Sequence, residues 1–312
     1  MDVDQVVAGV LAREPRAIAR AISLVEDGDD GLPALSAGVF PHTGAAATVG
    51  LTGAPGVGKS TIATALVRTA RAVGRRVAVL AIDPTSPYTG GALLGDRVRM
   101  QEHATDPDVF IRSMATRGHL GGMALAAPEA VRILDAAGFD LVVVETVGVG
   151  QAEIDVAAAT DTTLVVLAPG LGDAIQMAKA GILEVADVFV VNKADRDGAA
   201  EVQRELKQML HLGAARPWEP PVLATAAADG AGISELWNDI ERHRAWLTSS
   251  GTLAADREAA VVQEVRALAG ERLATSVAAQ LAADGGLRAK LRDRALDPYA
   301  AADDLIRRLA PG

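Results

Sequence analysis

The pattern of apolar and polar positions changes character along the chain. In residues 1–40 the apolar positions recur at roughly helical spacing, which predicts helices; these positions are Val6, Val7, Leu11, Ile18, Ile22 and Val25. A link that carries glycine and proline follows, from Gly31 to Gly44. From Ala46 onward, short continuous apolar runs alternate with longer helical stretches. From Gly251 the pattern is helical without strands.

The short apolar runs predict parallel strands that are buried on both faces, because they are apolar at consecutive positions. We predict them at Thr48–Thr52, Val77–Ile82, Val109–Ile111, Leu141–Val144, Thr163–Leu167, Val188–Val191 and Val222–Ala224. Helices are predicted between them at Lys59–Val73, Pro128–Ala137, Ala174–Ala180, Ala199–His211 and Ile233–Trp246. This alternation predicts an α/β protein with a mostly parallel central sheet and helices on both faces. Ligands of such sheets bind beyond the carboxyl ends of the strands.

Three regions follow from these patterns. We predict an N-terminal helical extension at 1–44, an α/β domain at 45–247 and a C-terminal helical region at 248–312. Several apolar residues of the last region fall on roughly one helix face, namely Val262, Val265, Leu268, Leu273, Val277 and Leu281. That face predicts contact with another surface.

Composition narrows the function classes. The 312 residues carry a formal net charge of −10, so the chain lacks the overall basic character of proteins that bind nucleic acid or anionic membranes. It has no cysteine, which excludes disulfides and thiolate metal sites. No apolar run approaches the ~20 residues that span a bilayer, and the acidic start MDVDQVV is no secretory signal. We therefore expect a cytoplasmic protein without a membrane or nucleic-acid partner.

The first predicted strand runs into a phosphate-binding loop. The pattern G-x-x-x-x-G-K-S stands between a strand and a helix, as a Walker loop requires; its residues are Gly53, Ala54, Pro55, Gly56, Val57, Gly58, Lys59 and Ser60, followed by Thr61. Glycines let the loop wrap an anion, and backbone N–H groups at the helix start then face the phosphates. Lys59 is expected to reach the β- and γ-phosphates, and the Ser60 hydroxyl to ligate Mg²⁺. The alternative is a glycine-rich turn before a helix.

A second motif predicts the choice of base. The strand at Val188–Val191 ends in N-K-x-D, which is Asn192, Lys193 and Asp195. The Asp195 carboxylate can accept from guanine N1–H and its 2-amino group, whereas adenine has no donors there. We expect Asn192 to brace the loop and the Lys193 stem to cover the base. Thr225 and Ala226, after the next strand, are candidates for a backbone contact to the guanine oxygen.

Carboxylates at strand ends predict a magnesium site. Glu145 follows the strand Leu141–Val144, where a Walker B acid holds Mg²⁺ or a ligating water. Asp83 ends another strand, and Asp96 lies in a glycine-flanked segment. With Ser60 they are the candidate ligands of one Mg²⁺, directly or through water, because Mg²⁺ keeps several waters. Each acid has a helix cap or a surface charge as its alternative.

Further candidates concern hydrolysis. Gly148 is placed to present its N–H to the γ-phosphate, and Gln151 to orient the attacking water. The candidate catalytic residues are therefore Lys59, Glu145 and Gln151. The candidate cis arginine fingers are Arg97, Arg99, Arg112 and Arg117, although surface ion pairs are the simpler interpretation for each.

These blocks together resemble the MeaB/ArgK family of SIMIBI-class P-loop GTPases. The resemblance rests on GAPGVGKST, AIDPTSPYTGGALLGDRVRM, FIRSMATRGHLGGM, ETVGVGQAEIDVA, LAPGLGDAIQMAKAGILEVADVFVVNKAD and ISELW, in this order from Gly53 to Trp237. Departures are small: Thr85, Tyr88 and Thr225 stand where relatives often carry serine, phenylalanine and serine. The N-terminal helices and the tail fit the family layout more loosely.

The resemblance implies a GTPase chaperone that uses GTP, GDP and Mg²⁺. Its client would be an adenosylcobalamin-dependent acyl-CoA mutase, chiefly methylmalonyl-CoA mutase. Such chaperones gate cofactor delivery from a cobalamin adenosyltransferase and protect or reactivate the mutase. The resemblance also implies a homodimer joined through the C-terminal helices, and a switch from Gly170 to Lys179 that signals to the mutase. We expect low intrinsic turnover that a partner accelerates. The alternatives are a nickel-type metallochaperone GTPase, which normally displays Cys/His clusters, and a scaffold that binds nucleotide without hydrolysis.

Overall fold

The chain forms two compact units in the computed structural model, which describes residues 2–84, 103, 105–116, 122–146, 156–170, 182–213 and 216–309. The first unit is Met1–Ala260 and the second is Val261–Gly312. The first unit holds a parallel sheet and all the described candidate site residues, and the second is helical.

The sheet of the first unit has seven strands, all paired in parallel, in the order β3-β2-β4-β1-β5-β6-β7. They are β1 (Ala47–Thr52), β2 (Val77–Pro84), β3 (Val109–Thr116), β4 (Leu141–Thr146), β5 (Thr162–Leu167), β6 (Val188–Asn192) and β7 (Val222–Thr225). Every predicted strand is thereby confirmed. The order places β1, which leads into the phosphate loop, between β4 and β5 at the centre of the sheet.

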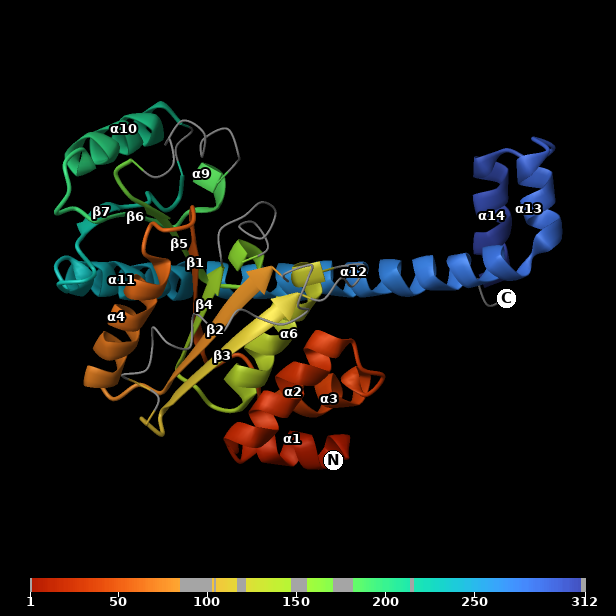
Figure 1. The fold of residues 1–312 in the computed structure, drawn as a ribbon, viewed down its shortest axis with the longest axis horizontal. Coiled ribbons are helices and arrows are strands. Elements are labelled where there is room, and N and C mark those ends of the chain that lie inside the picture. The colour runs from red at the N-terminus through yellow and green to blue at the C-terminus, as the bar shows by residue number, and fades with distance from the viewer. Residues whose placement is uncertain are drawn as a thin grey trace. The chain divides into compact units, whose positions relative to one another are not determined.

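Helices cover both faces of this sheet (Figure 1). On one face, α4 (Lys59–Ala72) and α11 (Ile233–Ser250) share a core with alternate residues of the central strands. On the other face, α6 (Gly122–Ala136) covers the β2–β4 side and α10 (Ala199–Leu212) covers the β5–β6 side. The short helix α9 (Ile182–Val185) precedes β6. Side chains of a strand alternate between the two faces of the sheet. A sheet that helices cover on both faces therefore needs strands that are apolar at consecutive positions.

The N-terminal residues form α1 (Val3–Leu11), α2 (Pro15–Asp27), α3 (Leu32–Val39) and a 3₁₀ helix, η1 (Phe40–His42). They share one apolar core with α6 and the strands beneath it. The prediction of a link from Gly31 to Gly44 was wrong over most of its length. A proline in the first turn of a helix costs no hydrogen bond, and α3 has its proline there. Its apolar residues Leu35 and Val39, one turn apart, are both buried.

Two other predicted boundaries change. Helix α6 begins at Gly122 rather than Pro128, so that the proline lies inside it. Strand β3 continues through polar residues to Thr116 because its whole length pairs with β2. One of these polar residues is Arg112, whose guanidinium donates to Glu26 (2.7 Å) and Ser23 (2.9 Å) of α2. This ion pair is the simpler interpretation of Arg112 and leaves it no role as a finger in this arrangement. The predicted helix Ala174–Ala180 lies outside the described residues.

The first turns of α12 (Thr252–Ala283) are fastened to the sheet by Arg257. Its guanidinium makes a bidentate ion pair with Asp161 (2.8 and 2.7 Å) and donates to the carbonyls of Gly44 (2.7 Å) and Ala46 (2.8 Å). The Asp161 hydrogen bond raises the pKa of Arg257 further. Asp161 also accepts from Thr48 N (3.1 Å). One arginine thus joins α12 to the starts of β1 and β5.

The second unit contains the rest of α12 together with α13 (Gly285–Arg292) and α14 (Pro298–Leu309). Its small core consists of Leu287, Ala301 and Leu305, with Val277 and Leu281 of α12 packed against it. The apolar face that the sequence predicts on α12 is therefore partly used inside the unit. Other members of that face, Val262, Val265 and Leu273, are exposed. Of the helices in the described part of the chain, none combines the length and the apolar character of a membrane span.

Candidate functional site

The phosphate loop joins β1 to α4 at the carboxyl edge of the sheet. Its glycines Gly53, Gly56 and Gly58 have φ of 136°, 80° and 100°, in the region that side chains disfavour. A Cβ on Gly53 would overlap the carbonyl oxygen of Val166 in β5, and one on Gly58 would overlap the Asn192 amide. Positive φ at all three positions, together with the close approach at Gly53 and Gly58, explains why this loop requires glycine.

This geometry predicts the effect of adding one methyl group. We expect Gly58→Ala to lower the free energy of unfolding by ~2–4 kcal/mol, because the methyl group must displace Asn192 and a left-handed backbone costs a non-glycine residue ~1 kcal/mol. The matched control is Gly74→Ala, where φ is 78° but no atom lies within 4 Å of the added Cβ, so that only the backbone cost of ~1 kcal/mol remains. Urea unfolding measures both, and equal losses would contradict the predicted overlap.

Two functional side chains of α4 lie buried at the start of this helix. Lys59 Nζ donates to the carbonyls of Gly53 (2.6 Å) and Ala54 (3.1 Å), so that the ammonium lies inside the loop. Ser60 Oγ donates to Glu145 Oε1 (2.6 Å) at the end of β4. All three side chains are buried. Glu145 and Ser60 come together because Leu51 of β1 pairs in register with Glu145 of β4. The structure thus brings the predicted Walker lysine, serine and strand-end carboxylate into one place.

Asn192 connects the phosphate loop to the loop after β7. Its Nδ2 donates to the Val57 carbonyl (2.8 Å), and its Oδ1 accepts from Thr225 Oγ1 (3.1 Å) and Ala227 N (3.2 Å). The side chain is buried, 3% exposed, and its amide oxygen and nitrogen both have partners. The bracing role expected of Asn192 therefore has a definite geometry, in which one amide holds two loops.

The other two residues of the N-K-x-D motif lie at the surface. Lys193 has φ of 58°, and its Nζ donates to the Gly56 carbonyl (2.6 Å), so that its stem extends over the phosphate loop. Asp195 is exposed, and its carboxylate makes no hydrogen bond or ion pair with the described residues. A carboxylate placed at the surface beside the Lys193 stem can accept from a planar ring that enters there.

The loop after β7 differs in detail from the sequence expectation. Ala226 N already donates to Ala231 O (3.0 Å), and its carbonyl accepts from Asp229 N (3.0 Å). Ala227 N lies nearer to the motif, at 3.2 Å from Asn192 Oδ1. Sequence reasoning missed Ala227. The sequence marks Ala227 only by its position two residues after Thr225, and the structure shows both residues donating to Asn192 Oδ1.

The other candidates lie wholly or partly outside the described residues. Asp83 is the next-to-last residue of β2, opposite Ala115 of β3, but its side chain lies outside the described residues. The segments with Asp96, Gly148 and Gln151 lie outside them as well. The same holds for Arg97, Arg99 and Arg117 and for most of the predicted third switch, of which Gly170 alone is described.

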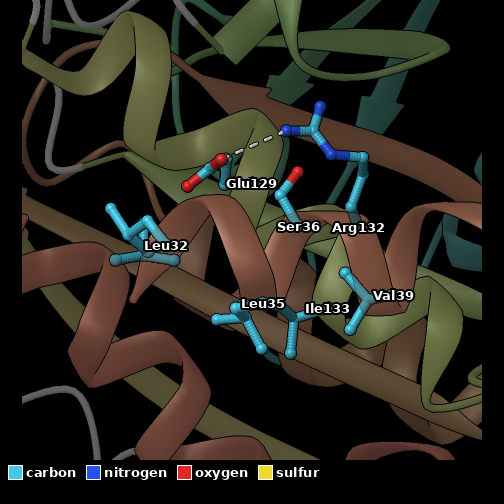
Figure 2. Close-up of a pocket in the computed structure, with 8 residues that line it drawn as sticks. Leu32, Leu35, Ser36, Val39, Glu129, Arg132 and Ile133 are labelled. Carbon is cyan, nitrogen blue, oxygen red and sulfur yellow. Dashed lines mark ion pairs between the residues drawn. The ribbon is translucent and has the colours of Figure 1, made fainter. Parts of the chain in front are cut away.

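A small pocket lies between α3 and α6, away from these residues (Figure 2). Leu32, Leu35, Val39 and Ile133 give it an aliphatic wall, and an ion pair between Arg132 and Glu129 (3.7 Å) lies at its side. None of the predicted site residues lines it. We therefore assign the candidate functional site to the carboxyl edge of β1, β4 and β6.

The chain is similar to known proteins in sequence and in fold. Residues 18–282 match a family model described as methylmalonyl-CoA mutase-associated GTPase MeaB. A protein of Pyrococcus horikoshii that is named as a GTPase is 45% identical over 311 residues, covering 98% of each chain. A mouse protein named methylmalonic aciduria type A homolog, mitochondrial, is 40% identical over 67% of this chain and 52% of its own length. The crystal structure of a protein named LAO/AO transport system kinase superposes with a TM-score of 0.72 at 28% identity, covering 98% of this chain and 97% of the other.

Proposed function

Because this chain belongs to the MeaB family of methylmalonyl-CoA mutase-associated GTPases, we propose that it couples its GTPase cycle to the service of an adenosylcobalamin-dependent acyl-CoA mutase. GTP hydrolysis is the family's activity. The service consists of gating the delivery of adenosylcobalamin from a cobalamin adenosyltransferase, and of protecting or reactivating the mutase. The family description, which names the mutase, and the mouse relative named for methylmalonic aciduria support this choice of client.

The nucleotide part of the proposal rests on the phosphate loop and the N-K-x-D motif. We assign the triphosphate to the backbone N–H groups from Gly56 to Thr61 and to Lys59, whose ammonium lies within the loop. We assign guanine to Asp195 and the Lys193 stem, with Asn192 and Thr225 forming the frame around them. Ala226 is the further proposed backbone contact to the guanine oxygen. The observation that carries the proposal is the pair of contacts made by the Asn192 amide, which bonds to Val57 of the phosphate loop and to Thr225 beside the proposed base site.

The donor set beside Lys59 fits Mg²⁺. The Ser60 hydroxyl and the Glu145 carboxylate are hard oxygen donors 2.6 Å apart, and an ion with water and phosphate oxygens as its other ligands needs only one or two from the protein. Ser60 and Glu145 would hold it, with Asp83 and Asp96 as further proposed ligands. When bound, Mg²⁺ neutralises charge on the β- and γ-phosphates. Lys59 adds its own positive charge there, and Gln151 and Gly148 are proposed to orient water and γ-phosphate.

The proposed client predicts a partner-dependent rate. We expect slow phosphate release from GTP by the protein alone and at least a roughly tenfold increase with purified methylmalonyl-CoA mutase, because partners of switch GTPases commonly complete the charge stabilisation. A multiple-turnover phosphate-release assay measures this, with the mutase alone as the blank. The mutase would be excluded as the client if it left the hydrolysis rate unchanged and if the protein did not pull it down in a nucleotide-dependent way. The GTPase activity would not be affected by that result.

We also propose that the protein is a homodimer joined by its C-terminal helices. Exposed Val265 and Leu273 on α12 support this, because apolar side chains that remain exposed on one helix are suited to a partner surface. We expect Val265→Glu to shift the mass in light scattering from dimer to monomer, whereas Gln263→Glu, a matched change on an exposed polar residue of α12, leaves the dimer intact. An unchanged mass for Val265→Glu would place the interface elsewhere.

A further inference from the structure

Two threonines are neighbours at the carboxyl edge of the sheet, on the face away from α4. Thr52 is the last residue of β1, and Thr146 is the last residue of β4. The strand register pairs Leu51 with Glu145, and each threonine comes one residue later. Leu51 packs in the core that contains α4, and Glu145 bonds to Ser60 of α4. Because successive side chains of a strand alternate between faces, both threonines point to the opposite face of the sheet.

The row of side chains that contains this pair is otherwise apolar. Its other members, in the order of the strands β3, β2, β5 and β6, are Met114, Ile82, Val165 and Phe189. All six side chains of the row are at most 2% exposed. A hydroxyl in this row costs free energy, because it is removed from water and the apolar side chains beside it offer no acceptor.

The two hydroxyls make fewer hydrogen bonds than they can form. Thr146 Oγ1 donates to the Leu51 carbonyl at 3.4 Å, which is long for a hydroxyl donor. Thr52 Oγ1 has no hydrogen-bond partner among the residues that the structure describes. Valine has the same shape and no hydroxyl to satisfy, so that the described contacts give no structural reason for threonine at Thr52. A buried polar group of this kind beside a functional site is a candidate for a role in that site.

Thr48 provides the contrast on the same face of the same strand. It is buried as well, but its hydroxyl accepts from Asp161 N at 2.7 Å. Thr48 lies near the amino end of β1 and Thr52 at the carboxyl end, next to Gly53 of the phosphate loop. The hydroxyl with a structural partner is therefore the one that is remote from the proposed nucleotide site.

We propose that Thr52 and Thr146 are positioning residues of the GTPase site, and that one water molecule held between their hydroxyls fixes the end of β4 that carries Glu145. Neighbouring strands lie ~4.8 Å apart, a spacing at which one water bridges two facing hydroxyls. Thr52 Oγ1 donates to this water, and the water donates to Thr146 Oγ1, whose own proton stays on the Leu51 carbonyl. The inference rests on the proposed assignment of GTP and Mg²⁺ to the phosphate loop.

The bridge acts on Glu145 through the backbone. Thr146 follows Glu145 directly, so that a fixed Thr146 side chain restrains the peptide group between them. Glu145 Oε1 and Ser60 Oγ, 2.6 Å apart, are the proposed protein ligands of Mg²⁺. Groups that orient a metal ligand without touching the metal typically change metal affinity or activity by ~10–100-fold. Loss of either hydroxyl should therefore weaken the contribution of Mg²⁺ and leave the other nucleotide contacts in place.

Thr52→Val removes the hydroxyl and keeps the shape of the side chain. We expect the turnover of GTP to fall about tenfold or more, and the gain in affinity that Mg²⁺ gives to a non-hydrolysable GTP analogue to become about tenfold smaller. Affinity without Mg²⁺ should stay within about twofold, because Lys59 and the backbone N–H groups are unchanged. The unfolding constant without nucleotide should stay within about fivefold, because burial of the added methyl group offsets the lost bond to water. Phosphate release, isothermal titration and urea unfolding measure these quantities.

Two control variants separate position from stability. Thr52→Ser keeps the hydroxyl and loses a buried methyl group, so that it should retain turnover and the Mg²⁺ effect while its unfolding constant rises. Thr48→Val leaves the Asp161 N–H without its acceptor. Its unfolding constant should rise about tenfold or more, with turnover equal to that of the unmodified protein.

Thr146→Val, alone and combined with Thr52→Val, tests the bridge itself. If one water joins the two hydroxyls, the double variant should lose no more turnover than the more affected single variant. Losses that multiply would overturn the shared water. A Thr52→Val protein with normal turnover and a normal Mg²⁺ effect would overturn the positioning role, whatever its stability. An unmodified protein without magnesium-dependent GTP hydrolysis would instead remove the proposed function on which this inference rests.

Discussion

Replacing Lys59 by alanine is expected to lower the turnover of GTP hydrolysis by roughly 10³-fold or more. The γ-phosphate gathers negative charge as it is transferred, and the ammonium that lies within the loop is the protein cation expected to meet it. Backbone N–H groups remain in the variant, so that binding weakens less than the chemical step. Single-turnover phosphate release gives the rate, and titration with a fluorescent GTP analogue gives the affinity.

The matched control for this experiment is Lys207→Ala. Lys207 is exposed on α10. Its replacement by alanine removes the same charge from the surface, so that the variant should hydrolyse GTP at the rate of the unmodified protein. Circular dichroism should show both variants folded, since the Lys59 hydrogen bonds to Gly53 and Ala54 lie within the phosphate loop. If Lys59→Ala hydrolyses GTP at more than about a tenth of the normal rate, then the phosphate loop is not the catalytic centre.

Replacing Asp195 by asparagine is expected to change the preferred base from guanine to xanthine. The carboxylate accepts two donors from guanine, whereas the asparagine amide donates to the 2-carbonyl of xanthine and leaves the guanine 2-amino group facing another donor. We expect the affinity for GTP to fall on the order of 10³-fold and that for xanthosine triphosphate to rise by a similar factor. Isothermal titration with both nucleotides in magnesium buffer measures the exchange.

Asp197→Asn is the control for the base experiment. Asp197 is exposed in the same loop, two residues away, and its substitution changes net charge equally. It should leave both affinities within about twofold, because surface charge alone acts weakly at physiological ionic strength. Because Asp195 is exposed, its substitution should also leave the melting temperature unchanged. An unchanged GTP affinity in Asp195→Asn would exclude Asp195 as the guanine-binding residue, even if Lys59→Ala lowers the turnover as expected.

Local rules account for what sequence reasoning placed correctly. A strand buried on both faces must be apolar at most consecutive positions, and the predicted strands β1, β4, β5 and β6 are buried along their whole length. A phosphate loop needs glycines in left-handed conformations at set spacing, and Gly53, Gly56 and Gly58 have them. Errors arose where two local rules conflict. The proline and glycines between Gly31 and Gly44 predict a link, but burial of Leu35 and Val39 makes the segment a helix.

The choice of partners depended on the tertiary structure. Ser60 and Glu145 lie 85 residues apart in the chain, and Asn192 and Val57 lie 135 apart. These pairs exist because β4 lies beside β1 and because the loops after β1, β6 and β7 open at the same edge. A strand order is a property of the whole sheet, so that no window of sequence contains it. The sequence could name the residues that bind phosphate and base, but not which of them would touch.

The same limit explains why Thr52 and Thr146 escaped sequence reasoning as a pair. Nothing near either threonine marks the other, because they are neighbours only through the register of β1 and β4. By itself, the sequence determined the fold class and the GTP-binding motifs, since both depend on apolar periodicity and on backbone conformations that a few consecutive residues control. The tertiary structure alone decided which polar side chains are buried and which of them contact one another, because such contacts join residues that lie far apart in the chain.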